Sequence, residues 1–167
     1  MTALKRPPSG MTEAEFVEAY GGLYEHSPRF AEAVWKTIPH ASLDTVEGLS
    51  HALHAAVEAA GKPAQLALIR AHPDLADRVK MSAESISEQA GAGLDNCSAE
   101  ELAEFRSLND AYKARFGFPF IKAVRGFSRL QILAEFHRRA GNDPDVEFRT
   151  ALDEIHKIAR LRLNDLA

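Results

Sequence analysis

The sequence predicts an all-α fold. Helix-capping patterns recur along its 167 residues, apolar residues return at intervals of three and four, and the period-two alternation typical of strands is nearly absent. With 46% hydrophobic residues, the chain can bury a substantial core. No linker, repeat or low-complexity tract divides it, which favours a single-domain helical bundle over residues 1–167, with residues 1–10 as a flexible N-terminal tail.

The helices of the first half are indicated by their ends. Thr12 and Glu15 form a capping box that opens a helix over TEAEFVEAY. Ser27 supplies a second cap, with Pro28 at the first helical position. The stretch SLDTVEGLSHALHAAVEAAG predicts a longer amphipathic helix, because its apolar residues recur at helical spacing and Gly61 suits the stop.

Three more helices are expected in the second half. Ser98 opens one that Gly117 ends, Ser128 and Gly141 bracket the next, and the last begins near Pro144 and runs to the C-terminus. The apolar residues expected on the second of these helices are Leu130, Leu133 and Phe136.

Composition and charge exclude several classes of function. The 24 acidic and 20 basic residues are mixed along the chain and give a net charge of −4, so no basic stripe is available to follow a nucleic-acid backbone. One cysteine excludes an internal disulfide. No apolar run could cross a membrane and no export signal is visible, so we expect a cytoplasmic protein that binds neither nucleic acid nor membrane.

The first unusual segment is AHPDLA, which begins at Ala71 and follows an apolar helical run. Proline disfavours α geometry in the residue before it, so His72 is expected in an extended conformation beyond the helix, with Pro73 restricting the chain behind it. Such a histidine can satisfy the last carbonyl groups of the helix or serve as a functional group.

The second unusual segment is SISEQAGAGLD. In a helix, Ser85, Glu88 and Gln89 stand at positions i, i+3 and i+4, so a hydroxyl, a carboxylate and an amide share one face and could contact one small polar molecule. A capping box from Ser85 to Glu88 on a solvated helix start is the alternative.

The third unusual segment is RFGFPFI, residues 115–121, in which three phenylalanines surround a glycine and a proline. A segment this apolar is expected to be buried, while its irregular backbone leaves N–H groups without helical partners. These donors could bind the oxygen atoms of a ligand, or the segment could simply pack a helix end.

The fourth unusual feature is an arginine, Arg162, on the apolar stripe of the last helix. The other members of this stripe are Phe148, Leu152, Ile155, Ala159 and Leu166. A buried guanidinium needs an anionic partner, and its planar fork suits carboxylates and urea-like oxygens. Snorkelling to the surface and an internal salt bridge are the alternatives.

A metal site is a competing interpretation of one helix. His51, His54 and Glu58 have the spacing of metal ligands on a common helix face. That face is turned away from the apolar stripe of the helix, so we expect it to be solvated and predict no metal there.

Taken in order, AHPDLA, SISEQAGAGLD, FRSLNDAYKARFGFPFIKAVRG and ALDEIHKIARLRLNDL resemble the 2-oxo-4-hydroxy-4-carboxy-5-ureidoimidazoline (OHCU) decarboxylase family, from about Thr12 onward. The resemblance implies an all-helical fold of this type, a homodimer, and a cofactor-independent carboxy-lyase that forms (S)-allantoin in urate degradation. A non-catalytic helical module that binds a small ureide or carboxylate, or a partner helix, is the alternative.

The resemblance also implies roles for the four unusual segments, which are then expected to meet around one pocket. His72 matches the catalytic histidine and Glu88 matches its partner carboxylate. Arg162 matches a substrate-binding arginine, with Arg160 as the alternative. The other substrate-binding residues that the resemblance implies are Pro73, Ser85, Gln89, Phe120, Ile121, Lys122 and Ala123.

Overall fold

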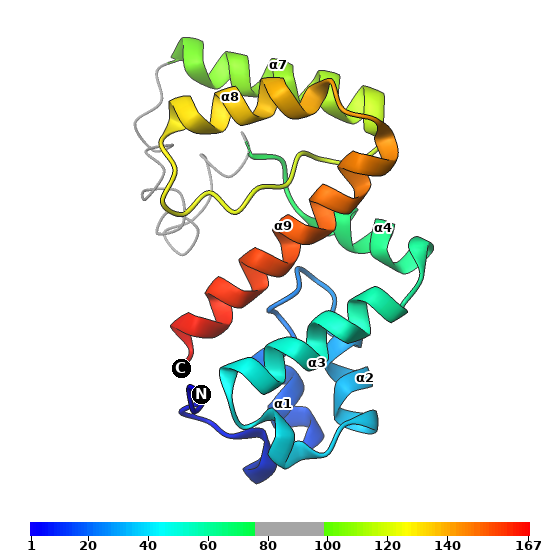
Figure 1. The fold of residues 1–167 in the computed structure, drawn as a ribbon, viewed down its shortest axis with the longest axis vertical. Helices are drawn as coiled ribbons and strands as arrows, with labels where there is room; N and C mark the ends of the chain where they lie inside the picture. The colour runs from blue at the N-terminus through cyan, green and yellow to red at the C-terminus, as the bar shows by residue number, and fades with distance from the viewer. Residues whose placement is uncertain (76–98) are drawn as a thin grey trace. The chain divides into compact units, whose positions relative to one another are not determined.

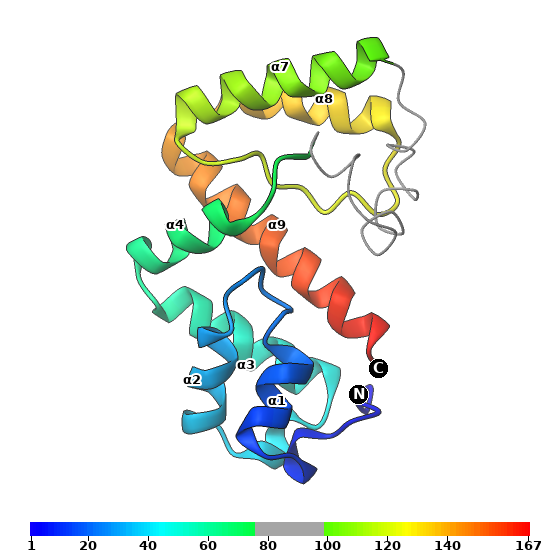
Figure 2. The same cartoon turned by 180° about the vertical axis from the view of Figure 1, so that it is seen from behind.

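The computed structural model describes residues 1–75 and 99–167 (Figures 1 and 2). Within that part the chain is helical, as predicted, and its only extended pairing is an isolated bridge between Ala3 and Thr45. It forms two compact units, which are described separately: unit 1 comprises Met1–Ala71 and Ile155–Ala167, and unit 2 comprises His72–Glu154. The prediction of a single domain over residues 1–167 stays a prediction, and the expected cap Ser98 lies outside the described residues.

Unit 1 is built from short helices around an aromatic and aliphatic core. Phe16 is fully buried, and its ring lies 5.2 Å from that of Trp35, which joins the first two helices. The elements are η1 (Pro8–Gly10), α1 (Glu13–Tyr20), α2 (Arg29–Thr37), η2 (His40–Leu43), α3 (Val46–Ala59), α4 (Lys62–Ala71) and the C-terminal part of α9 (Pro144–Asp165).

The ends of these helices follow local chemistry. The capping box at Thr12 is present, and Thr45 caps α3 by accepting a hydrogen bond from the N–H of Gly48. Gly61 follows the end of α3 with a φ of 88°, a left-handed conformation that favours glycine. Ser27 differs from the prediction: its hydroxyl donates to the carbonyl of Glu25, and the helix starts one residue later.

The N-terminal segment makes several contacts with the chain before α3, and its flexibility stays a prediction. The N–H of Leu4 donates to the carbonyl of Asp44, and the N–H of Val46 donates to the carbonyl of Thr2. The hydroxyl of Ser9 donates to the carboxylate of Asp44 over 2.6 Å. Because Leu4 is also buried, both polar and apolar contacts fix this segment against the chain that precedes α3.

Unit 2 contains α7 (Ala99–Phe116), α8 (Arg129–Ala140) and the N-terminal part of α9. The first two helices lie side by side and run in the same direction (Figures 1 and 2). Two charged pairs join them, Glu101 with Arg129 at 2.5 Å and Glu104 with His137 at 3.2 Å. Since parallel neighbours cannot be joined by a tight turn, the segment 117–128 returns along the pair in an extended course.

The core of unit 2 is aromatic. The ring of Tyr112 meets those of Phe120 and Phe136 edge to face, and the latter two rings stack at 3.9 Å. Burial raises the pKa of Tyr112, so its hydroxyl stays protonated at neutral pH. Leu130 and Leu133 lie on α8, as expected, but the side chain of Leu130 is 68% exposed while Leu133 is buried.

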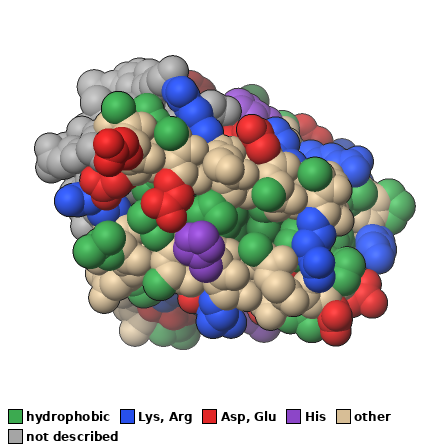
Figure 3. All heavy atoms as spheres, turned by 90° about the horizontal axis from the view of Figure 1, so that it is seen from above, with side chains coloured by type: hydrophobic (Ala, Val, Ile, Leu, Met, Phe, Trp, Pro, Cys, Tyr) green, Lys and Arg blue, Asp and Glu red, His purple; other side chains and the backbone are tan. Residues whose placement is uncertain are grey.

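The surface mixes both signs of charge. Acidic, basic and apolar side chains are interspersed on the face that Figure 3 shows, which agrees with their mixing along the sequence. Among the helices of the described part, none has both the length and the apolar character that crossing a membrane requires.

Candidate active site

His72 lies immediately beyond the last residue of α4 and is 3% exposed. The helix ends before it, as the following proline predicts, because the ring of Pro73 disfavours α geometry in the preceding residue. The imidazole is therefore presented from a restricted backbone and is shielded from bulk water.

The chain after His72 is tied to α7 within unit 2. The carboxylate of Asp74 accepts a hydrogen bond from Nζ of Lys113 over 3.1 Å, and the side chain of Leu75 is buried. One charged contact and one apolar contact therefore fix the backbone on the C-terminal side of Pro73.

The predicted substrate-binding residues Phe120, Ile121, Lys122 and Ala123 are all buried. They belong to the extended segment between α7 and α8, as expected from its glycine and proline. Such a segment needs partners for its backbone groups from outside itself. Two side chains of unit 2 supply them, and neither was among the residues predicted from the sequence.

Arg139 is the first of these side chains. It is 1% exposed, its Nη1 donates to the carbonyl of Ile121 over 2.6 Å, and its guanidinium carbon lies 4.3 Å from the ring centre of Phe120. Its Nε lies 3.0 and 3.2 Å from the two carboxylate oxygens of Glu147, which is fully buried. A buried ion pair thus holds the segment through both a carbonyl and a ring.

Glu154 is the second. Its Oε1 accepts a hydrogen bond from the N–H of Ala123 over 3.2 Å and lies 3.8 Å from Nζ of Lys122. Both carboxylate and ammonium are buried, so each needs the other. One of the backbone donors that the sequence assigns to substrate is therefore engaged by a side chain of the protein.

Arg162 and Arg160 belong to unit 1. Nη1 of Arg162 lies 2.8 Å from the carboxylate of Glu25, with the two side chains 22% and 18% exposed. Arg160 lies 3.5 Å from Glu47 in a more exposed pair. The internal salt bridge considered from the sequence is thus present at Arg162, in a partly accessible form that leaves room for an additional contact.

The remaining predicted residues are not brought together by the described structure. Ser85, Glu88 and Gln89 lie outside the described residues. His72 belongs to unit 2 and Arg162 to unit 1, so the shared pocket stays a prediction.

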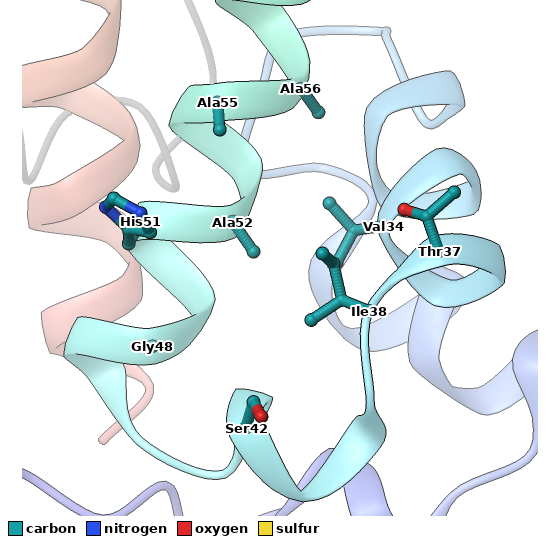
Figure 4. A pocket seen from close by; sticks show the side chains of 9 residues that line it. All are labelled: Val34, Thr37, Ile38, Ser42, Gly48, His51, Ala52, Ala55 and Ala56. Carbon is teal, nitrogen blue, oxygen red and sulfur yellow. The ribbon is translucent and has the colours of Figure 1, made fainter.

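A cavity of about 450 Å³ lies in unit 1 and contains none of the predicted site residues (Figure 4). Val34 of α2 and Ile38, just after α2, face the alanines of α3 across it. The residues that line it are Val34, Thr37, Ile38, Ser42, Gly48, His51, Ala52, Ala55 and Ala56.

Comparisons with known proteins give a consistent result. The family description OHCU decarboxylase matches residues 9–164. The 2-oxo-4-hydroxy-4-carboxy-5-ureidoimidazoline decarboxylase of Haloferax volcanii is 45% identical over 153 residues, which cover 92% of this chain and 89% of that protein. The protein of the same name from Mus musculus is 38% identical and covers 95% of this chain and 89% of its own length.

Two solved structures are also similar. One, described as (S)-allantoin synthase, superposes with a TM-score of 0.76 at 36% identity over 93% of this chain, which spans half of that longer chain. The other, an OHCU decarboxylase crystallised in the presence of (S)-allantoin, gives a TM-score of 0.67 at 27% identity and covers 83% of this chain and 89% of its own.

Proposed function

Because this chain belongs to the OHCU decarboxylase family and is a carboxy-lyase that produces (S)-allantoin in urate degradation, we propose that His72 is its proton-transferring group. The observation that carries this assignment is the buried imidazole fixed between the end of α4 and Pro73. Glu88 is its proposed partner, because a neighbouring carboxylate favours the protonated imidazole and selects its tautomer.

The reaction requires the protein only to orient the substrate and to deliver one proton. The bond between the ring carbon and the carboxylate breaks, carbon dioxide leaves, and the electron pair moves toward the adjacent imine of the substrate. The substrate thus carries its own electron sink, and no cofactor is needed. The enol-like product must then receive a proton on one face, which a fixed acid such as His72 can deliver.

The other proposed contacts orient the substrate. Phe120, Ile121, Lys122 and Ala123 would offer backbone groups to its oxygen atoms, with Pro73, Ser85, Gln89 and Arg162 completing the set. Arg139 and Glu154 support this role, since they hold the segment from its protein side. Because the N–H of Ala123 is bound to Glu154, the proposed contacts from backbone donors fall to residues 120–122.

Two further assignments concern the location of the enzyme and its oligomeric state. We propose that the enzyme acts in the cytoplasm and as a homodimer, both of which the family resemblance implies. The mass of the purified chain by light scattering decides the second.

Substitution of His72 is the experiment that tests the mechanism. Freshly generated substrate is given to the purified chain, and the appearance of (S)-allantoin is followed by circular dichroism. His72→Ala and His72→Gln should each lower kcat/KM by about a hundredfold to ten-thousandfold, as loss of a general acid does.

Two controls sharpen this experiment. His51→Ala removes an exposed histidine of unit 1 and should leave kcat/KM unchanged. Wild-type activity in a folded His72 variant would contradict the assigned role. If the wild-type chain produced no excess of the S product, the non-catalytic alternative would replace the mechanism altogether.

A further inference from the structure

We propose that unit 1 carries a site for a divalent transition-metal cation, formed by the imidazoles of His54 and His156 and the carboxylate of Glu58. One ligand atom from each side chain lies within 4.8 Å of the other two. In residues 1–75 and 99–167, this is the one group of three or more His, Cys, Asp or Glu side chains that converges in this way. None of its three residues is among those assigned to decarboxylation.

Two helices of unit 1 supply the ligands. His54 and Glu58 stand four residues apart on α3 and therefore share a face, while His156 comes from α9. Nε2 of each histidine lies 3.8 Å from a different oxygen of the Glu58 carboxylate. The carboxylate thus lies between two imidazole nitrogens. A cation bound among these three groups would bring them closer to one another.

Tyr24 orients one of the ligands. Its hydroxyl lies 2.7 Å from Nδ1 of His156, whose side chain is only 9% exposed. When this hydroxyl accepts from Nδ1–H, Nε2 carries the lone pair that a metal requires. Metal-binding histidines commonly have their second nitrogen held in this way.

The ligand types favour one class of ion. Two imidazoles and one carboxylate form a set that Zn²⁺ uses, whereas Mg²⁺ and Ca²⁺ prefer oxygen ligands. The rings of His54 and His156 now stack at 3.7 Å and 17°. Because imidazole lone pairs lie in the ring plane, a cation requires one ring to turn. His54, with a side chain 51% exposed, has the space to do so.

The convergent group differs from the one that the sequence spacing offered as a competing interpretation. His51 and His54 share α3 with Glu58, but the convergent group instead includes His156, about a hundred residues further along the chain. The face of α3 was expected to be solvated, and its exposed His54 agrees with that expectation. His156 is largely buried and adds a ligand of restricted position, which the solvated face of α3 does not have by itself.

Zinc titration of the full chain tests the proposal. The protein is prepared without a histidine tag, freed of metal with a chelator, and titrated with Zn²⁺ by isothermal calorimetry. We expect saturation at one ion per chain and a higher unfolding midpoint in Zn²⁺ than in Mg²⁺, because a ligand that binds only the folded state stabilises it. His54→Ala and Glu58→Gln should each weaken Zn²⁺ binding by at least about tenfold.

Two further variants separate the site from incidental binding. Tyr24→Phe removes only the hydroxyl and should weaken Zn²⁺ binding by about tenfold. His137→Ala removes an exposed histidine that lies 3.2 Å from one carboxylate, Glu104, and should leave binding unchanged. No saturable binding to the wild type, or equal binding to the His54 and Glu58 variants, would overturn the proposal.

Discussion

The two units use their charged side chains in different ways. In unit 2, Arg139 and Glu147 are 1% and 0% exposed, and Lys122 and Glu154 are also buried. In unit 1, Arg162 and its partner are about one-fifth exposed, and His54 is half exposed. Arg139 and Glu154 bind backbone atoms of Ile121 and Ala123, whereas the charged groups of unit 1 bind one another at the edge of solvent.

The difference has an energetic reason. A buried charge that loses its partner pays a large desolvation penalty, so such pairs hold one geometry. A partly exposed pair gains little over hydration and can exchange one partner for a ligand at small cost. The buried pairs of unit 2 are therefore suited to holding the backbone in one position. The partly exposed pairs of unit 1 are suited to binding a ligand.

Breaking the buried pair should give the largest effect on stability. Arg139→Met leaves Glu147 uncompensated and removes the donor to Ile121, so the free energy of unfolding should fall by about 3–5 kcal/mol. Urea denaturation followed by circular dichroism measures this. Arg138→Ala, which breaks an exposed pair with Glu135 on the same helix, is the matched control and should change stability little.

A double variant separates stability from support of the segment. Replacing both Arg139 and Glu147 with methionine removes both buried charges and should recover much of the lost stability. Because the donor to Ile121 is still missing, kcat/KM should stay below that of the wild type. Full recovery of activity along with stability would show that this pair does not position the segment.

Glu154 should have a smaller effect on folding but a distinct kinetic one. Glu154→Ala removes the acceptor for the N–H of Ala123, which frees the segment, so KM should rise by about tenfold to a hundredfold. Glu154→Gln keeps an oxygen acceptor and should restore KM most of the way, even though Lys122 loses its charged partner. This rescue distinguishes positioning from a general loss of packing.

The neighbouring carboxylate provides the control for Glu154. Asp153 lies on the same helix, is exposed and pairs with Arg149, one turn earlier on α9. Asp153→Ala should leave KM at the wild-type value. An equal rise in KM for Glu154→Ala and Glu154→Gln would mean that the ionic contact, and not the hydrogen bond to Ala123, determines the geometry.

Local features of the fold could be predicted from the sequence. The capping boxes at Thr12 and Ser128 and the stop at Gly61 depend on residues three or four positions apart, and all three are present. The break before His72 follows from the next residue alone. The sequence did not separate the exposed Leu130 from the buried Leu133, because periodicity does not reveal which side of a helix its neighbours cover.

The supports of the site could not be predicted in the same way. Arg139 sits beside Arg138 near the end of α8, and only one of the two is buried. Its partner follows a helix break at Gly141, and its carbonyl acceptor belongs to a different segment. Such partners are chosen by tertiary packing, for which neighbouring sequence carries no signal. His156 was missed for the same reason.

Arg162 should give the smallest change in stability and a clear change in binding. Its pair with Glu25 is partly exposed, so Arg162→Ala should lower the free energy of unfolding by less than about 1 kcal/mol. If its guanidinium also contacts substrate, KM should nevertheless rise by about tenfold or more, since a charged hydrogen bond is lost. Steady-state kinetics and urea denaturation on the same preparation measure both quantities.

Two variants decide which arginine and which contact matter. Arg160→Ala removes the more exposed candidate and should leave KM unchanged, so a rise there would transfer the assignment from Arg162 to Arg160. Glu25→Gln keeps the guanidinium and weakens only the internal ion pair. If it raised KM as much as Arg162→Ala does, the arginine would act through the salt bridge alone, and unit 1 would resemble unit 2 in using its charges as a support.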